Sequence, residues 1–117
     1  MSSATQAPVF ADRVNSIVGS LGLSREELGS IVDASPRSIA RWSAGKAAPQ
    51  RLTKQRLLEL AYVAEAVAEV IPRERANAWM LTPNRLLDHD SPASRIHLGG
   101  YKDVLDLIEA LADGVVV

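Results

Sequence analysis

The sequence predicts an all-α protein: an N-terminal helix-turn-helix module joined by a long helix to a small C-terminal helical domain. Apolar residues recur at spacings of three and four, which is the period of a helix with one buried face. Residues that favour helix caps stand where several of the apolar runs begin. No segment shows a convincing strand pattern, apart from an extended end at 115–117.

Length and composition indicate one compact domain, or two small helical modules that share a core. The chain has 117 residues and a formal net charge of −1, with the apolar and charged fractions of a globular protein. It has no cysteine, which excludes disulfides, thiol catalysis and thiolate metal ligands. Met1–Pro8 lacks the basic and apolar segments of a signal peptide. We therefore expect residues 1–8 to be a flexible tail and the protein to be cytoplasmic.

Two helices are predicted before residue 33. The first spans about 9–21 and ends at Gly22. Its apolar residues at helical spacing are Phe10, Val14, Ile17, Val18 and Leu21. Ser24-Arg25-Glu26-Glu27 then has the pattern of a capping box, which opens a short helix with Leu28, Ile31 and Val32 on one face.

A second short helix follows within about four residues. Ser35 can cap it, Pro36 suits its first position, and Gly45 can take the left-handed conformation beyond its end. Ile39 and Trp42 face inward, whereas Arg37, Ser38 and Arg41 face outward. Such side chains reach phosphates and base edges when the second helix of a helix-turn-helix lies in a DNA groove. The simpler alternative is a helical hairpin whose arginines only keep it soluble.

A long helix is predicted from about Gln50 to Ile71. Its apolar residues cover more than one face, which predicts burial on two sides. They are Leu52, Leu57, Leu58, Leu60, Ala61, Val63, Ala64, Val67, Val70 and Ile71. Either the helix lies between the two modules, or one face belongs to a dimer interface. Charged residues interrupt it, which excludes a membrane span.

The C-terminal half is predicted to be shorter helices separated by breaks. Residues 73–81 form one, with Ala76, Trp79 and Met80 inward, and 85–87 form at most a further turn or two. The stretch 88–100 is polar and contains Pro92, Gly99 and Gly100, so we expect a loop with at most one helical turn. The last helix spans about 101–112, and Gly114 follows it.

One cluster resembles a metal or catalytic site. Asp88-His89-Asp90 with His97 combines carboxylates and imidazoles. The cluster lacks helical i, i+4 spacing, and the chain has no Gly-rich phosphate loop or nucleophile motif. We expect a solvated loop, no metal, no cofactor and no enzymatic activity.

Charge is distributed unevenly along the chain. Residues 24–56 contain seven Lys/Arg against three Asp/Glu, a balance of +4, whereas 99–117 contain one Lys against four Asp/Glu, a balance of −3. A basic region suits a polyanion, and an acidic end suits a basic partner surface. Val115–Val117 either fold back onto their own core or insert into a partner's cleft. Random scatter of solvated charge is the simpler explanation of the asymmetry.

Two groups of residues resemble a known family. The first is Ser35-Pro36-Arg37-Ser38 with the spacing Trp42-x-x-Gly45-x-x-x-Pro49, which is similar to Xre-type helix-turn-helix modules. The second and more specific group is 79–87, Ser91-Pro92, Gly99 and 104–115. Together they resemble the Xre/MbcA/ParS family of antitoxins from type II toxin–antitoxin systems. The loop 88–100 departs from the family because it lacks a Gly-rich run, so no contacts are transferred there.

The resemblance implies an antitoxin that neutralises a RES-domain toxin, an enzyme that degrades NAD⁺. Family members block the toxin's active site with their C-terminal region, here roughly Gly99 to Val117. They commonly dimerise, assemble with the toxin into larger complexes and repress their own operon. The residues expected to bind toxin are Tyr101, Asp103, Asp106, Glu109, Asp113, Gly114, Val115, Val116 and Val117. Those expected to bind operator DNA are Ser35, Arg37, Ser38, Arg41, Lys46, Arg51 and Lys54.

The expected organisation is therefore a tail (1–8), a helix-turn-helix module (9–56) and a toxin-binding domain (57–117), with the long helix shared. Two other functions remain open. One is a plain helix-turn-helix repressor whose second half only dimerises. The other is a DNA-independent inhibitor in which the helix-turn-helix is purely structural.

Overall fold

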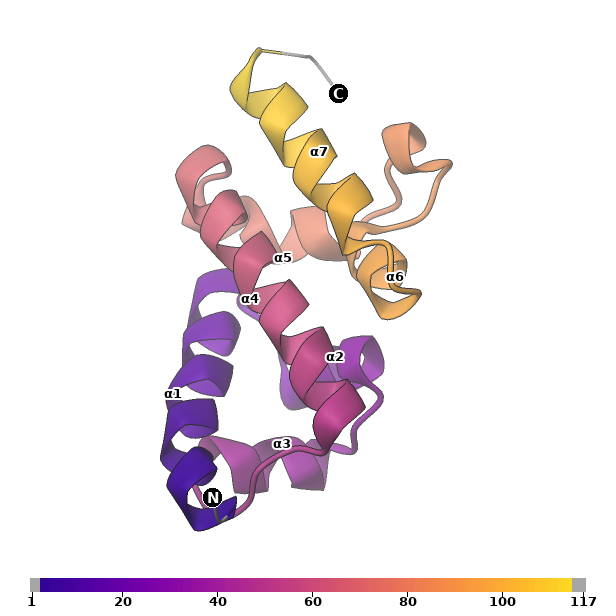
Figure 1. Cartoon of the computed structure of the whole chain (residues 1–117). Coiled ribbons are helices and arrows are strands. Elements are labelled where there is room, and N and C mark those ends of the chain that lie inside the picture. The colour runs from indigo at the N-terminus through magenta and orange to yellow at the C-terminus, as the bar shows by residue number, and fades with distance from the viewer. Residues whose placement is uncertain (1–2, 115–117) are drawn as a thin grey trace.

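Residues 3–114 form seven α-helices and one short 3₁₀ helix, and this range contains no strand. The computed structural model describes the backbone of these residues and the side chains from Ala7 onward. Figure 1 shows α1, α2 and α3 at one end of an elongated molecule and α5, α6 and α7 towards the other, with α4 running between them. The all-α prediction is confirmed.

The short helices of the N-terminal half begin at the predicted caps. α2 spans Arg25–Val32, and its capping box is complete: the Glu27 amide donates to Ser24 Oγ at 3.0 Å, and the Ser24 amide donates to Glu27 Oε1 at 2.9 Å. α3 spans Pro36–Ser43, and Ser35 Oγ accepts from the Ser38 amide at 3.1 Å. These local bonds satisfy amides that the helix itself leaves unpaired.

α1 begins earlier than predicted. It spans Ser3–Leu21, so residues 3–8 are helical where a flexible tail was expected. Pro8 lies inside this helix, and the sequence reasoning had taken it as a boundary. The added turns bring Ala7 into the interior, where it is 4% exposed.

α4 spans Arg51–Val70, within one residue of the prediction at each end. It contacts α1 and α2 in the N-terminal half and α6 and α7 in the C-terminal half, so it does lie between the two groups. The prediction of burial on two sides was too broad, however. Leu52, Leu58 and Tyr62 are 80%, 40% and 62% exposed, because no element of the described chain covers that face.

One apolar cluster runs through both halves, from Val14 on α1 to Ile108 on α7. Leu57, Leu60 and Val63 of α4 are fully buried in its centre. Both groups of helices therefore pack against the same central helix, and the predicted boundary at residue 57 lies inside α4, the helix that the two modules were expected to share.

The C-terminal half contains one helix more than predicted. α5 (Arg73–Leu81), η1 (Arg85–Leu87) and α7 (Tyr101–Ala112) follow the expected bounds, although Trp79 is only half-buried. α6 (Pro92–His97) occupies the stretch that was predicted to be mostly loop. Ser91 caps it by accepting from the Ser94 amide at 3.0 Å. The Ser-Pro pair is thus a helix start, and burial of Ala93 and Ile96 holds the helix in place.

Candidate protein and DNA interfaces

The basic face of α3 carries the residues with the strongest DNA-binding pattern. Arg37 and Arg41 are one turn apart and both are exposed, and Lys46 is exposed just beyond the helix. Ile39 and Trp42, on the opposite side, are 1% and 7% exposed and anchor α3 to the core. The arginine side chains are therefore presented outward from a fixed helix, which leaves them able to contact a phosphate backbone.

The other predicted DNA-contacting residues are differently placed. Ser35 Oγ donates to Ser38 Oγ at 3.1 Å, so both hydroxyls take part in the cap. The Lys54 ammonium lies 5.6 Å from the centre of the Phe10 ring, a cation–π distance that directs it towards α1. Arg51 is exposed at the first position of α4. Arg37, Arg41, Lys46 and Arg51 are thus exposed cations, whereas the two serines take part in the cap of α3 and Lys54 lies against Phe10.

α7 has an apolar face and an acidic face. Val104, Leu107 and Ile108 are buried against the core. Asp106, Glu109 and Asp113 are all exposed, and their spacing of three and four places them within about 60° around the helix axis. We call these three residues the acidic stripe; Lys102 lies at its N-terminal end and is also exposed.

The acidic stripe interacts unfavourably with the dipole of its own helix. Glu109 and Asp113 lie at the C-terminal end of α7, where the helix dipole is negative and where no basic residue of the last turn compensates it. Each such carboxylate typically costs about 0.3–1 kcal/mol at an exposed position. A cationic partner surface would relieve this repulsion, and the relief would contribute to binding.

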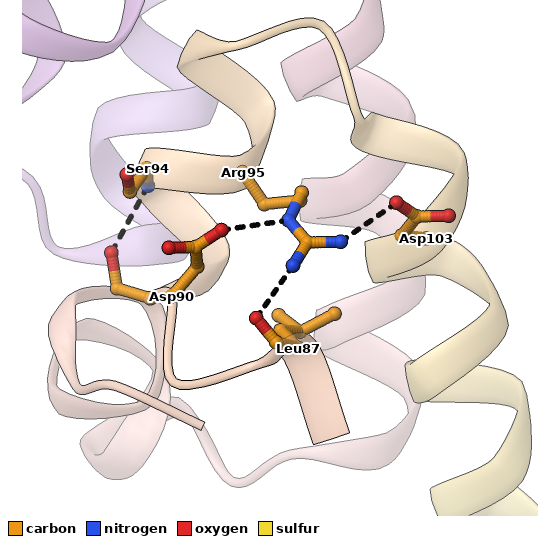
Figure 2. Close-up of polar contacts among 6 residues, drawn as sticks. Leu87, Asp90, Ser94, Arg95 and Asp103 are labelled. Atoms are coloured by element: carbon orange, nitrogen blue, oxygen red, sulfur yellow. Dashed lines mark hydrogen bonds and ion pairs between the residues drawn. The ribbon is translucent and has the colours of Figure 1, made fainter. Parts of the chain in front are cut away.

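Asp103 differs from the other carboxylates of α7 because it has an internal partner. Figure 2 shows Arg95 of α6 at the centre of a small network. Its guanidinium donates to Asp103 Oδ2 at 2.9 Å, to Asp90 Oδ2 at 3.1 Å and to the Leu87 carbonyl at 2.5 Å. The hydrogen bond to Asp103, with a smaller contribution from Asp90, raises the pKa of Arg95 against the opposing effect of desolvation. Asp103 thus ties α7 to α6 and to the turn after η1.

Sequence reasoning missed a groove beside α7. It has a volume of about 800 Å³ and lies between the end of α4, α5, the 82–89 segment and α7. Trp79 and Leu111 are among its apolar lining residues, and Arg75, Arg85 and His89 add basic groups. The sequence spacing of Trp79 gave no signal of the groove, because an inward-facing tryptophan and a half-buried, groove-lining one have the same spacing.

The structure does not gather the histidines and aspartates that resembled a metal site. His97 Nδ1 lies 3.2 Å from the Ile31 carbonyl oxygen, facing α2, whereas Asp90 is paired with Arg95. Asp88 and His89 both adopt left-handed backbone conformations in the turn after η1. Within residues 3–114, no three His, Asp or Glu side chains converge as metal ligands.

Tyr101 is half-buried and packs against the core, and Gly114 follows α7 with a φ of +90°. Val115, Val116 and Val117 were also predicted to bind toxin, and they lie outside the described residues. None of the helices in the described chain is long and apolar enough to cross a membrane.

Comparison with known proteins identifies the family. The domain described as the antitoxin Xre/MbcA/ParS C-terminal toxin-binding domain matches residues 64–114. The mycobacterial cidal antitoxin MbcA of Mycobacterium tuberculosis H37Rv is 60% identical over 109 residues, which cover 93% of this chain and 96% of that protein. The chain belongs to the Xre/MbcA/ParS antitoxin family.

Two further relatives agree with this. MbcA of Mycobacterium bovis has the same 60% identity and coverage. A chain in the crystal structure of the M. tuberculosis MbcT–MbcA toxin–antitoxin complex is also 60% identical, with a TM-score of 0.84, covering 93% of this chain and 98% of that one. Both findings agree with membership of the antitoxin family.

The family match covers the end of α4, all of α5, η1, α6 and α7, and Gly114. It therefore contains the acidic stripe, the Arg95 network and the groove beside α7. The basic face of α3 lies outside it. These are two separate surfaces, one in the family's toxin-binding domain and one in the N-terminal half.

Proposed function

We propose that this antitoxin neutralises a RES-domain, NAD⁺-degrading toxin by covering the toxin's active site with residues 101–117. The acidic stripe on α7 is the observation that supports the proposal best. It lies within the family's toxin-binding domain and runs to the C-terminal end of the helix. The resemblance to the family supplies the RES-domain identity of the toxin.

The chemistry of the toxin's substrate explains why an acidic stripe fits. NAD⁺ carries a pyrophosphate, and proteins bind such groups with arginines, lysines and helix N-termini. Asp106, Glu109 and Asp113 offer carboxylates to the same cationic groups. Val115–Val117 would then fill the entrance of the cleft, and the terminal carboxylate would add a further negative charge. Competition for cationic groups would thereby exclude the substrate.

Co-expression with the proposed RES-domain toxin partner tests the proposal. We expect the full-length chain to copurify with the toxin and to preserve cellular NAD⁺. A version ending at Ala112 loses Asp113 to Val117, so we expect NAD⁺ to fall. Equal protection by both versions would place inhibition elsewhere on the surface. Failure of both to bind would refute the antitoxin mechanism and favour the plain repressor.

We further propose that α2 and α3 act as a helix-turn-helix and that the antitoxin represses its own operon. The supporting observation is the exposed pair Arg37 and Arg41 on a helix that buried Ile39 and Trp42 hold in place. As a toxin inhibitor and DNA-binding protein, the antitoxin would work in the cytoplasm. It would do so as a homodimer and, with toxin, as a larger hetero-oligomer.

Replacing Arg37 and Arg41 together by alanine is expected to weaken operator binding on the order of a hundredfold, because each phosphate or base contact contributes about 1–3 kcal/mol. The slope of log affinity against log salt should fall by up to about 2, as two counterion-releasing contacts are lost. Fluorescence anisotropy with operator DNA at several salt concentrations measures both. Arg75→Ala with Arg85→Ala is the matched control, since it removes the same charge from exposed sites near the groove. Unchanged binding in the test variant would favour the DNA-independent inhibitor.

A further inference from the structure

The groove beside α7 has an apolar wall that no part of the described chain covers. The wall is formed by residues from the ends of α4 and α7 and from α5, including Val70, Ile71, Pro72, Trp79 and Leu111. Trp79 is only half-buried there, although a tryptophan gains more than most side chains from burial. The volume of about 800 Å³ lies within the range of pockets that hold a drug-sized group. The wall therefore has room for a further apolar segment.

The basic groups of the groove have a structural explanation. Val70 and Leu111 both line it, so the C-terminal ends of α4 and α7 meet there, and Figure 1 shows both ends towards the same end of the molecule. The C-terminal end of a helix is negative, and neither helix has a basic residue in its last turn. Arg75, Arg85 and His89 supply positive charge beside these ends from other elements. The apolar wall is the feature that still lacks a partner.

The chain leaves α7 through a turn that leads back towards the helix. Gly114 has a φ of +90°, and its amide donates to the Leu111 carbonyl at 3.1 Å. This is one of the two bonds of a Schellman turn, in which an apolar residue after the left-handed glycine commonly packs on the last turns of the helix. Residues 115–117, which we call the valine segment, are all valine. Three residues span up to about 10 Å, so the valine segment can reach the groove that Leu111 lines.

We propose that the valine segment docks in the groove beside α7 when the antitoxin is free of toxin. Its side chains are apolar, like the wall, and carry no charge. Docking removes valine side chains and the Trp79 ring from water, and this burial favours the docked form. Because the valine segment belongs to the same chain, its effective concentration at the groove is high.

Docking sets up a competition with the toxin, and this consequence rests on the function proposed above. The valine segment cannot occupy its own groove and the entrance of the toxin's cleft at once, so toxin binding has to release it. If the docked form outnumbers the undocked form by about tenfold, the apparent affinity for toxin falls by about the same factor. The groove would then cover the valine segment until toxin is present.

Nuclear magnetic resonance of the two tryptophans in the free protein tests the docking. Trp79 lines the groove, whereas Trp42 on α3 is 7% exposed and anchors the other half of the molecule. A version ending at Gly114 should show a changed Trp79 indole N–H resonance and an unchanged Trp42 resonance. In the full-length chain, nuclear Overhauser contacts should join the Trp79 ring to valine methyl groups that the truncation removes. Identical Trp79 resonances in both forms, without such contacts, would refute the docking.

Gly114→Ala keeps the valine segment and tests the turn. A Cβ at this position meets no atom within 4 Å, so only the positive φ opposes alanine. The strain of a left-handed alanine should lower the docked population on the order of tenfold and move the Trp79 resonance towards its position in the truncated version. Gly99→Ala is the matched control, because Gly99 has a φ of +92° and a Cβ there makes only ordinary contacts. It should leave the Trp79 resonance unchanged, and an equal effect of both variants would contradict the proposal.

Adding toxin separates this inference from the proposed function. When toxin binds, the contacts between Trp79 and the valine segment should disappear. If toxin binds and the contacts persist, the docking stands and the cleft-filling role of the valine segment is wrong. If the free chain shows no such contacts and the Trp79 resonance moves only when toxin is added, the groove is a toxin-binding surface and the docking is wrong.

Discussion

Reversing the charge of the acidic stripe is expected to abolish toxin neutralisation. In the variant Asp106→Lys with Glu109→Lys, two lysines would face the cationic groups that we propose the toxin presents. Replacing attraction by repulsion at a buried interface costs several kcal/mol, so affinity should fall at least on the order of a hundredfold. Titration calorimetry with purified toxin measures the affinity, and cellular NAD⁺ during co-expression measures protection.

The fold should tolerate this change. Asp106 and Glu109 are both exposed, and neither belongs to an ion pair within the described chain. The control variant Asp12→Lys with Glu26→Lys changes net charge equally, at exposed residues of α1 and α2. It should bind toxin like wild type. If both variants lose affinity alike, long-range charge rather than the stripe governs binding, and undiminished affinity in the test variant alone would remove α7 from the interface.

Gly29→Ala is expected to be strongly destabilising, by about 2–4 kcal/mol. Gly29 lies buried inside α2, and a Cβ there would be 2.3 Å from the backbone oxygen of Ala34. The turn has little freedom to move away, because the Ala34 amide donates to the Gly29 carbonyl at 3.0 Å. The added methyl group would therefore separate α2 from α3. Urea unfolding followed by circular dichroism measures the loss of unfolding free energy.

Gly19→Ala is the matched control, and the opposite sign is expected for it. Gly19 lies within α1, and a Cβ at that position meets no atom within 4 Å. Alanine favours helix over glycine by roughly 0.5–1 kcal/mol, so stability should rise slightly. A loss of less than about 0.5 kcal/mol for Gly29→Ala would show that the turn between α2 and α3 relaxes more easily than its hydrogen bonds indicate.

Local signals in the sequence predicted most helix starts correctly. The capping box of α2 and the Ser-Pro start of α3 were both identified, because each cap is a bond between residues three apart. The same Ser-Pro signal stands at Ser91, yet the stretch containing α6 was predicted to be mostly loop because Pro92, Gly99 and Gly100 were all taken as breaks. Pro8 misled in the same way at α1. Both errors arose where a residue that disfavours helix lies beside residues whose burial favours it. A local sequence pattern does not show which residues become buried.

The candidate surfaces were only partly predictable. The outward arginines of α3 were named from helical spacing, and the carboxylates of α7 were named from the acidic balance of 99–117 and the family resemblance. All of these carboxylates and arginines are exposed. Spacing did not reveal that Asp103 is bound to Arg95, or that Lys54 is directed onto Phe10. It also predicted burial for Leu58, because apolar residues on a long helix have the same period on an exposed face as on a core face.

By itself, the sequence determined the helical class, the caps and the periodic faces, since these depend on residues three or four positions apart. Only the tertiary structure decided which charges remain available and which apolar residues stay uncovered. Arg95 meets Asp103 because α6 and α7 pack together, and Leu58 and Tyr62 stay exposed because no described helix packs over that face of α4. Such outcomes depend on contacts between separate elements, and a local pattern carries no information about them.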